Sequence, residues 1–156
     1  LHSSQKSTMR YLCFVLALLS SSAFAFEKIT DDAIKQLLSQ HSTFVMQKEP
    51  EKLMALFADS YQQFDKKQQK TTTKDELKKI YNGNFMVAKL IINTIQLTNS
   101  KIADDGLHAQ INTHLFNRYL IEYAEKQHVL TQEEDWQSDV FLENGQLKYL
   151  KTEKTN

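Results

Sequence analysis

Apolar residues recur with a helical period in three segments of the first half of the chain. The first segment begins at Asp31, and the second begins at Pro50, a residue suited to the first turn of a helix. The third begins at Thr73, where Thr73 and Glu76 fit a capping box, and Asn82-Gly83-Asn84 is predicted to end it. The predicted inward positions are Ile34, Leu37, Leu38, His41 and Val45 in the first segment, Leu53, Leu56 and Phe57 in the second, and Leu77, Ile80 and Tyr81 in the third.

The second half of the chain changes to the period of two that is typical of strands, starting near Phe85. A change of phase around Asn93-Thr94 predicts a β-bulge in the first long strand. Turns are predicted at three places, which separate four long antiparallel strands. These turns are Asp104-Asp105-Gly106, Glu125-Lys126-Gln127 and Asn144-Gly145.

Helices followed by strands predict an α+β fold in which the helices cover one face of a sheet. A short strand is expected at Ser60–Asp65, and the polar segment Lys66–Thr72 is expected to be a loop. We therefore predict three N-terminal helices packed on a strongly curved, mainly antiparallel sheet of four to five strands. A curved sheet wrapped around a long helix makes a cone with an open end, where a small ligand would bind.

The N-terminal pattern is that of a cleavable secretory signal. Arg10 precedes an apolar run at Tyr11–Leu19, and Ala23-Phe24-Ala25 places small residues at a cleavage site. The run is shorter than the roughly 20 residues needed to span a bilayer, so no stable membrane insertion is expected after cleavage. Residues 1–8 precede a natural start at Met9 and are interpreted as an over-extended reading frame or added residues. We predict a signal peptide at 9–25, a single domain at 26–156, and a periplasmic or secreted bacterial protein.

Charge and cysteine content exclude several classes of function. The chain has 19 basic and 19 acidic residues, and removal of Lys6 and Arg10 with the leader leaves 17 basic residues against 19 acidic ones. A net charge of about −2 gives no electrostatic basis for binding nucleic acid. Cys13 is the single cysteine and lies in the leader, so the predicted mature domain has neither a disulfide nor thiol chemistry.

Three segments resemble the NTF2-like superfamily, also called the SnoaL-like or cystatin-like α+β cone. They are Glu49–Tyr61, Thr73–Tyr81 and Trp136–Leu147. The resemblance covers nearly the whole predicted mature chain and implies a cone pocket and a homodimer formed through the sheet. Because the superfamily contains isomerases, dehydratases, cyclases, transport factors and domains without known activity, it implies little about chemistry.

Two residues are candidates for a general base, each with a structural alternative. The steroid-isomerase branch of that superfamily is similar in plan and places its base, an Asp, after the first strand, where Asp65 stands here. That branch also places a Tyr on the first helix, where this chain has Ser42-Thr43-Phe44. Asp65 could instead be a solvated residue beside two lysines. His41 could be a pocket acid or base, or a histidine bonded to a carbonyl or to solvent.

Two polar clusters in the strand region are expected to lie outside the pocket. His108 and His114 share one strand face, but about 20 Å separates them at the rise of an extended strand, so one metal ion cannot bridge them. We interpret this face, with Asn112, as the polar exterior or, at one end, as the mouth of the cone. The run Glu133-Glu134-Asp135 is interpreted as a solvated outer face, because neighbouring strand residues point to opposite sides.

The sequence favours an exported, non-catalytic binding domain, without metal or cofactor, for a small apolar ligand or a protein of the cell envelope. Two alternatives remain: an isomerase- or cyclase-type enzyme using Asp65 or His41, and an accessory subunit of an envelope or secretion assembly. Aromatic residues are at least as often core as ligand contacts. The predicted pocket residues are Phe44, Tyr61, Tyr81, Tyr123 and Trp136.

Overall fold

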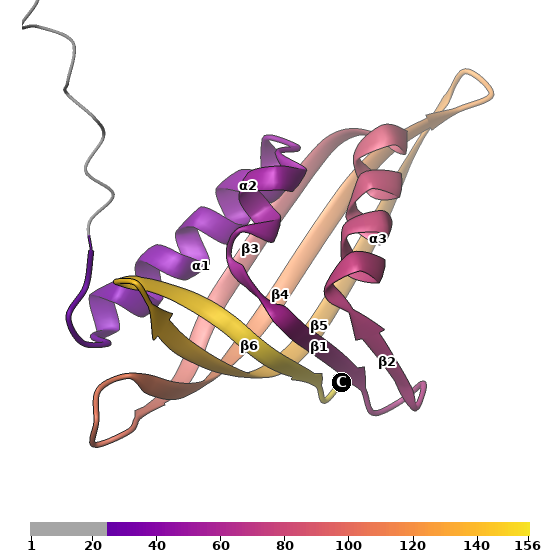
Figure 1. The fold of residues 1–156 in the computed structure, drawn as a ribbon. Coiled ribbons are helices and arrows are strands. Elements are labelled where there is room, and N and C mark those ends of the chain that lie inside the picture. Colours follow the sequence, from indigo (N-terminus) through magenta and orange to yellow (C-terminus); the bar gives the residue numbers. More distant parts are fainter. Residues whose placement is uncertain (1–24) are drawn as a thin grey trace, which may run out of the picture.

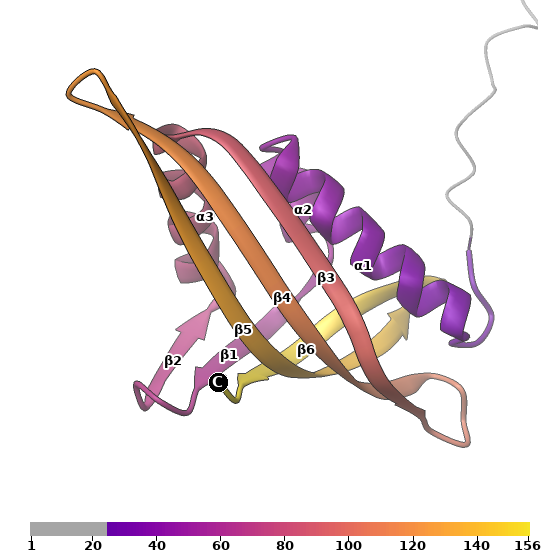
Figure 2. The same ribbon diagram turned by 180° about the vertical axis from the view of Figure 1, so that it is seen from behind.

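Three helices lie on the concave side of a strongly curved sheet in the computed structural model, which describes residues 25–156 (Figure 1). The predicted signal peptide falls outside the described residues except for Ala25. Seen from behind, the long strands form a single convex surface with the helices beyond it (Figure 2). The predicted α+β architecture, with helices first and strands second, is therefore confirmed.

The helices begin where the sequence predicts. α1 (Asp31–Met46) is capped by Thr30, whose hydroxyl accepts from the backbone N–H of Ala33 at 3.1 Å. α2 (Pro50–Met54) starts at its proline, and α3 (Lys74–Val87) starts with the predicted capping box of Thr73 and Glu76. All five predicted inward positions of α1 are buried, which fixes the face that it presents to the sheet.

Two helix ends differ from the prediction. α2 ends at Met54, so Phe57 belongs to the first strand and not to the helix. α3 does not stop at Asn82-Gly83-Asn84 but continues to Val87. The reason is the next turn: Phe85 packs on Tyr81 with ring centroids 5.8 Å apart, and this i,i+4 contact extends the apolar stripe.

The sheet has six strands, one more than the upper limit predicted. The additional strand is β2 (Lys70–Thr73), within the segment predicted to be a loop, where three consecutive threonines pair antiparallel with β1 (Phe57–Asp65). Threonine is β-branched and suits an extended edge. The four long strands are β3 (Ala88–Ile102), β4 (His108–Tyr123), β5 (Lys126–Glu143) and β6 (Gln146–Lys154). The strand order in the sheet is β2-β1-β6-β5-β4-β3, with β1 and β6 parallel and all other neighbours antiparallel.

The predicted bulge at Asn93-Thr94 is wrong, because β3 is regular there. Register shifts occur instead between Ala88 and Leu90 and between Leu97 and Asn99. Asn93 is buried on the concave face, where it donates from Nδ2 to Asn117 Oδ1 at 2.5 Å. A polar residue at an inward position concealed the true phase of the strand.

The turns are close to the predicted ones. Asn144 and Gly145 have φ of 52° and 75°, as a two-residue hairpin between β5 and β6 requires. Gly106 has φ of 69° in the turn between β3 and β4. The β4–β5 turn is centred on Ala124 and Glu125, and its hairpin projects well past α3 (Figure 1). No helix within residues 25–156 is long and apolar enough to cross a membrane.

Candidate functional site

A cavity of about 160 Å³ lies between α3 and the concave face of the sheet. Five of the six strands contribute to its wall, together with one side of α3. Its aromatic surface comes from Tyr81 on α3, Tyr119 on β4 and Trp136 on β5. Concave sites of this kind are where small ligands bind in proteins.

Three charged side chains meet next to the aromatic part of this wall. Lys154 Nζ lies 3.3 Å from Asp65 Oδ2 and 2.7 Å from Glu134 Oε1. Glu134 also accepts a hydrogen bond from Trp136 Nε1 at 2.7 Å and another from Gln132 Nε2. Because β1, β5 and β6 each supply one of the charges, this cluster ties three strands together as well as lining the cavity.

The backbone of Gln68, together with Lys154, favours the ionised form of Asp65. The pKa of Asp65 lies below its ordinary value, chiefly because the backbone N–H of Gln68 donates to Oδ1 at 2.9 Å, with Lys154 adding to the shift. Burial lowers the pKa of Lys154, but the hydrogen bonds and charges of Glu134 and Asp65 outweigh it and raise that pKa overall. A carboxylate stabilised in this way is a weak base.

His41 is completely buried behind the cavity wall. Its Nδ1 lies 3.0 Å from the Tyr149 hydroxyl, and its Nε2 lies 3.3 Å from the Tyr81 hydroxyl. Phe57 and Trp136 pack against the ring, with centroids 5.8 and 5.9 Å away. Burial lowers the pKa of His41 to about 3, so the imidazole is neutral at neutral pH.

The predicted site residues separate into different environments. Tyr81 and Trp136 line the cavity, as does Asp65, so three of the candidates do come together. Tyr61 is buried in the core, and Tyr123 is 75% exposed near the tip of the β4–β5 hairpin. An aromatic side chain next to a hairpin turn has no opposing layer to cover it, which is why Tyr123 lies outside the cavity.

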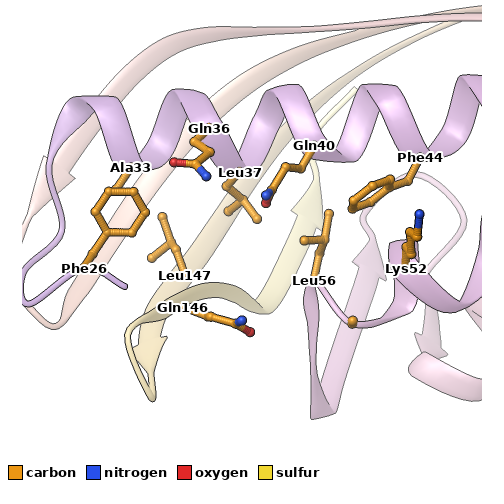
Figure 3. A pocket seen from close by; sticks show the side chains of 11 residues that line it. Phe26, Ala33, Gln36, Leu37, Gln40, Phe44, Lys52, Leu56, Gln146 and Leu147 are labelled. Carbon is orange, nitrogen blue, oxygen red and sulfur yellow. The ribbon is translucent and has the colours of Figure 1, made fainter. Parts of the chain in front are cut away.

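Phe44 belongs to a second groove, on the other side of α1. This groove has a volume of about 240 Å³ and runs between α1, α2 and the start of β6. Figure 3 shows Phe26 at one end of it, Phe44 and Lys52 at the other, and Leu37 between them. Lys52 Nζ lies 5.9 Å from the centre of the Phe44 ring and 3.2 Å from Glu49 Oε1.

Sequence reasoning missed two of the principal cavity residues, Glu134 and Lys154. The interpretation of Glu133-Glu134-Asp135 as a solvated outer face is wrong for its middle member, because Glu134 is buried and points inward. The alternation of side chains along the strand could have identified Glu134, because it lies two residues from Trp136 and therefore on the same face of β5. Asp135 is paired instead with His114 at 2.8 Å.

Within residues 25–156, no three His, Cys, Asp or Glu side chains gather in an arrangement that could hold a metal ion.

Comparison with known proteins finds similarity in structure only. No family model matches the chain, and no curated protein does either. A candidate scytalone dehydratase from Novosphingobium aromaticivorans superposes with a TM-score of 0.67 at 17% identity, over 79% of this chain and 80% of that one. An NTF2-like protein of unknown function from Shewanella oneidensis gives 0.63 at 12%, over 80% and 98%. A type 2 hexachlorocyclohexane dehydrochlorinase gives 0.62 at 12%, over 79% and 82%.

These likenesses establish that the chain has the NTF2-like fold. At such low identity they carry no information about its reaction or ligand. The three neighbours include both enzyme names and a protein of unknown function. What the cavity does must therefore be argued from its own residues.

Replacement of Lys154 tests the importance of the charged cluster. We expect Lys154→Met to lower the free energy of unfolding by about 3 kcal/mol, because it leaves Glu134 buried without its cationic partner. Lys151→Met is the matched control on the same strand, since Lys151 is exposed and paired only at the surface with Asp139; a loss below about 1 kcal/mol is expected. Urea unfolding of both variants measures the difference, and equal stabilities would contradict this role.

The buried imidazole predicts a specific dependence of stability on pH. The folded-state pKa of His41 lies far below its unfolded value, so between pH 6 and pH 4 the unfolded chain binds the additional proton. Stability should therefore fall with acidification by about 1.4 kcal/mol per pH unit more in the native chain than in His41→Gln. Urea unfolding at several pH values measures both slopes. Parallel slopes would mean that His41 is protonated, or solvated, in the folded state.

Proposed function

We propose that this chain binds a small, neutral, partly apolar molecule in the cavity beneath α3 and does not transform it chemically. The observation that carries the proposal is the pairing of Asp65, Glu134 and Lys154 with one another. Each of these groups already has strong partners within the protein. They therefore shape and polarise the cavity, and no free base remains among them to remove a proton from a ligand.

The volume of the cavity and the side chains that line it indicate the class of ligand. A cavity of about 150 Å³ accommodates a molecule such as benzene, so a volume of about 160 Å³ fits a single six-membered ring with a small substituent. Tyr81, Tyr119 and Trp136 offer flat apolar surface, and Asn117 offers a polar contact on the same wall. An amphipathic ring matches this combination.

The charged side chains that line the cavity make a neutral ligand more favourable than an anionic one. Two carboxylates and one ammonium give the cluster of Asp65, Glu134 and Lys154 a net charge of −1, and the exposed Lys70 adds a second ammonium to the cavity wall. An anionic ligand would lose its hydration on entering, and the ammonium group of Lys154 is already paired with the two carboxylates. A neutral ligand avoids that cost.

The alternative function is an isomerase- or cyclase-type enzyme with Asp65 or His41 as the base. Asp65 lines the cavity, and this is the observation that favours the alternative. Against it stand the lowered pKa of Asp65 and the engagement of both His41 ring nitrogens by tyrosine hydroxyls. We infer binding rather than catalysis because neither group is both basic and free.

We further propose an exported protein that forms a homodimer through its convex sheet face. Export is supported by the pattern at Met9–Ala25. The dimer is supported by apolar residues that lie across β3, β4 and β5 on the convex face. Two of them are largely solvent-exposed: Leu90 is 53% exposed and Ile92 is 43% exposed. An accessory role in an envelope assembly would use the same surface. The residues concerned are Leu90, Ile92, Phe116, Leu120 and Val129.

The single tryptophan of the chain provides a direct test of binding. Because Trp136 lines the cavity, we expect cyclohexanone and cyclohexanol to change its fluorescence saturably, and cyclohexanecarboxylate to bind at least about tenfold more weakly. Asn84→Phe should abolish the change by filling the cavity, whereas Asn82→Phe, on the same helix but outside the wall, should not. The proposal fails if neither neutral ring gives saturation, or if the carboxylate binds most tightly.

Sedimentation equilibrium tests the proposed dimer. The native chain should sediment as a dimer at micromolar concentration, and Ile92→Lys should sediment as a monomer, because the new ammonium would lie in the interface beside Arg118, the cross-strand neighbour of Ile92, and like charges repel. Gln110→Lys, at the far end of the same face, is the control and should remain dimeric. A native chain that stays monomeric at high concentration contradicts the dimer.

A further inference from the structure

Three buried polar groups form a chain from the core to the cavity. Tyr149 on β6, His41 on α1 and Tyr81 on α3 follow one another through contacts of 3.0 Å and 3.3 Å. Tyr149 and His41 are at most 1% exposed, and Tyr81 is 8% exposed and lines the cavity. Each phenol has one hydrogen to donate, and a neutral imidazole has one donor and one acceptor nitrogen.

The Tyr149 end of this hydrogen-bonded series determines which group donates and which accepts in each contact. Among residues 25–156, the Tyr149 hydroxyl has His41 Nδ1 as its one side-chain hydrogen-bond partner. If Nδ1 carried the hydrogen, the Tyr149 hydrogen would be buried without an acceptor, which is costly. The arrangement that satisfies all groups has Tyr149 donating to Nδ1 and Nε2–H donating to the oxygen of Tyr81.

The outer end is then a hydrogen-bond donor. Tyr81 accepts from His41 Nε2, so its own hydrogen is free to point elsewhere. Burial keeps this phenol protonated by raising the pKa of Tyr81 well above its ordinary value. Two other donors on the cavity wall, Trp136 Nε1 and Lys154 Nζ, are already paired with Glu134. The exposed Lys70 and the side-chain amides of Asn84 and Asn117 also line the cavity and are further donors.

We propose that His41 is a positioning residue, which commits the Tyr81 hydroxyl to donate into the cavity, and that the ligand therefore carries a hydrogen-bond-accepting oxygen. This inference rests on the proposed function in one respect, because it assumes that a ligand binds in the same cavity. It assigns to His41 a role other than acid–base chemistry. It also narrows the ligand from any neutral ring to one with an uncharged oxygen acceptor.

The hydrogen position on His41 can be measured without any ligand. A long-range nitrogen–proton NMR correlation of the imidazole, assigned by its loss in His41→Gln, should show a neutral ring with its hydrogen on Nε2 from pH 5 to pH 8. A hydrogen on Nδ1, or a protonated ring at pH 6, would overturn the proposal. This result stands whether or not a ligand is found.

A matched pair of probes tests the donor itself. Cyclohexanone and methylenecyclohexane have the same shape, but only the ketone accepts a hydrogen bond. Trp136 fluorescence should report tighter binding of cyclohexanone, and Tyr81→Phe should weaken that binding by about tenfold while changing the hydrocarbon by less than about twofold. Equal affinity of both probes for the native chain overturns this inference, whereas binding of neither contradicts the proposed function.

Two substitutions of His41 separate positioning from packing. His41→Gln should keep the preference for the ketone within about twofold, because an amide oxygen and nitrogen can accept from Tyr149 and donate to Tyr81 in the same directions. His41→Leu should lose the preference. If His41→Leu does not fold, Tyr149→Phe replaces it and should reduce the preference, because Nδ1 then lacks its donor. An unchanged preference in His41→Leu, or in Tyr149→Phe where it replaces that variant, overturns the role of His41.

Discussion

The structure depends on one buried contact, in which His41 lies between the hydroxyls of Tyr149 and Tyr81. A neutral imidazole inside an apolar core is tolerable only when both nitrogens are hydrogen-bonded, so the three elements that supply these groups are held in fixed relative positions. α1 is thereby fastened to the centre of the sheet through β6, and α3 is held over the sheet at the distance that leaves a cavity. The shape of the cavity follows from this requirement.

The charged cluster completes the same space from the other side. Lys154 joins Asp65 and Glu134 where β1, β6 and β5 run side by side, and Trp136 connects that cluster to the aromatic wall. Buried charges are costly unless they are paired and hydrogen-bonded, and here they are both. A cluster whose charges are paired with one another offers no free base to a bound molecule. This separates the cavity from one that offers an unpaired base, although the two share one fold.

Much of the fold could be predicted from the sequence, because its signals are local. Pro50, the capping box at Thr73 and the Asn144-Gly145 turn each specify backbone geometry within a few residues. The errors arose where tertiary contacts decide: Phe85 prolongs α3 by packing on Tyr81, and the threonines of β2 form a strand only because β1 lies beside them. The cavity was found in part, through Tyr81, Trp136 and Asp65. Glu134 and Lys154 were missed because the sequence does not show that these two charged residues, from different strands, meet in a buried ion pair and are not exposed to solvent.

The most direct test of the account is a crystal structure of the chain soaked with cyclohexanone. We expect electron density for one ring in the cavity beneath α3, with the ketone oxygen within hydrogen-bonding distance of the Tyr81 hydroxyl and with His41 still between Tyr81 and Tyr149. Density only in the groove beside Phe44, or a ring in the cavity whose oxygen faces away from Tyr81, would contradict it.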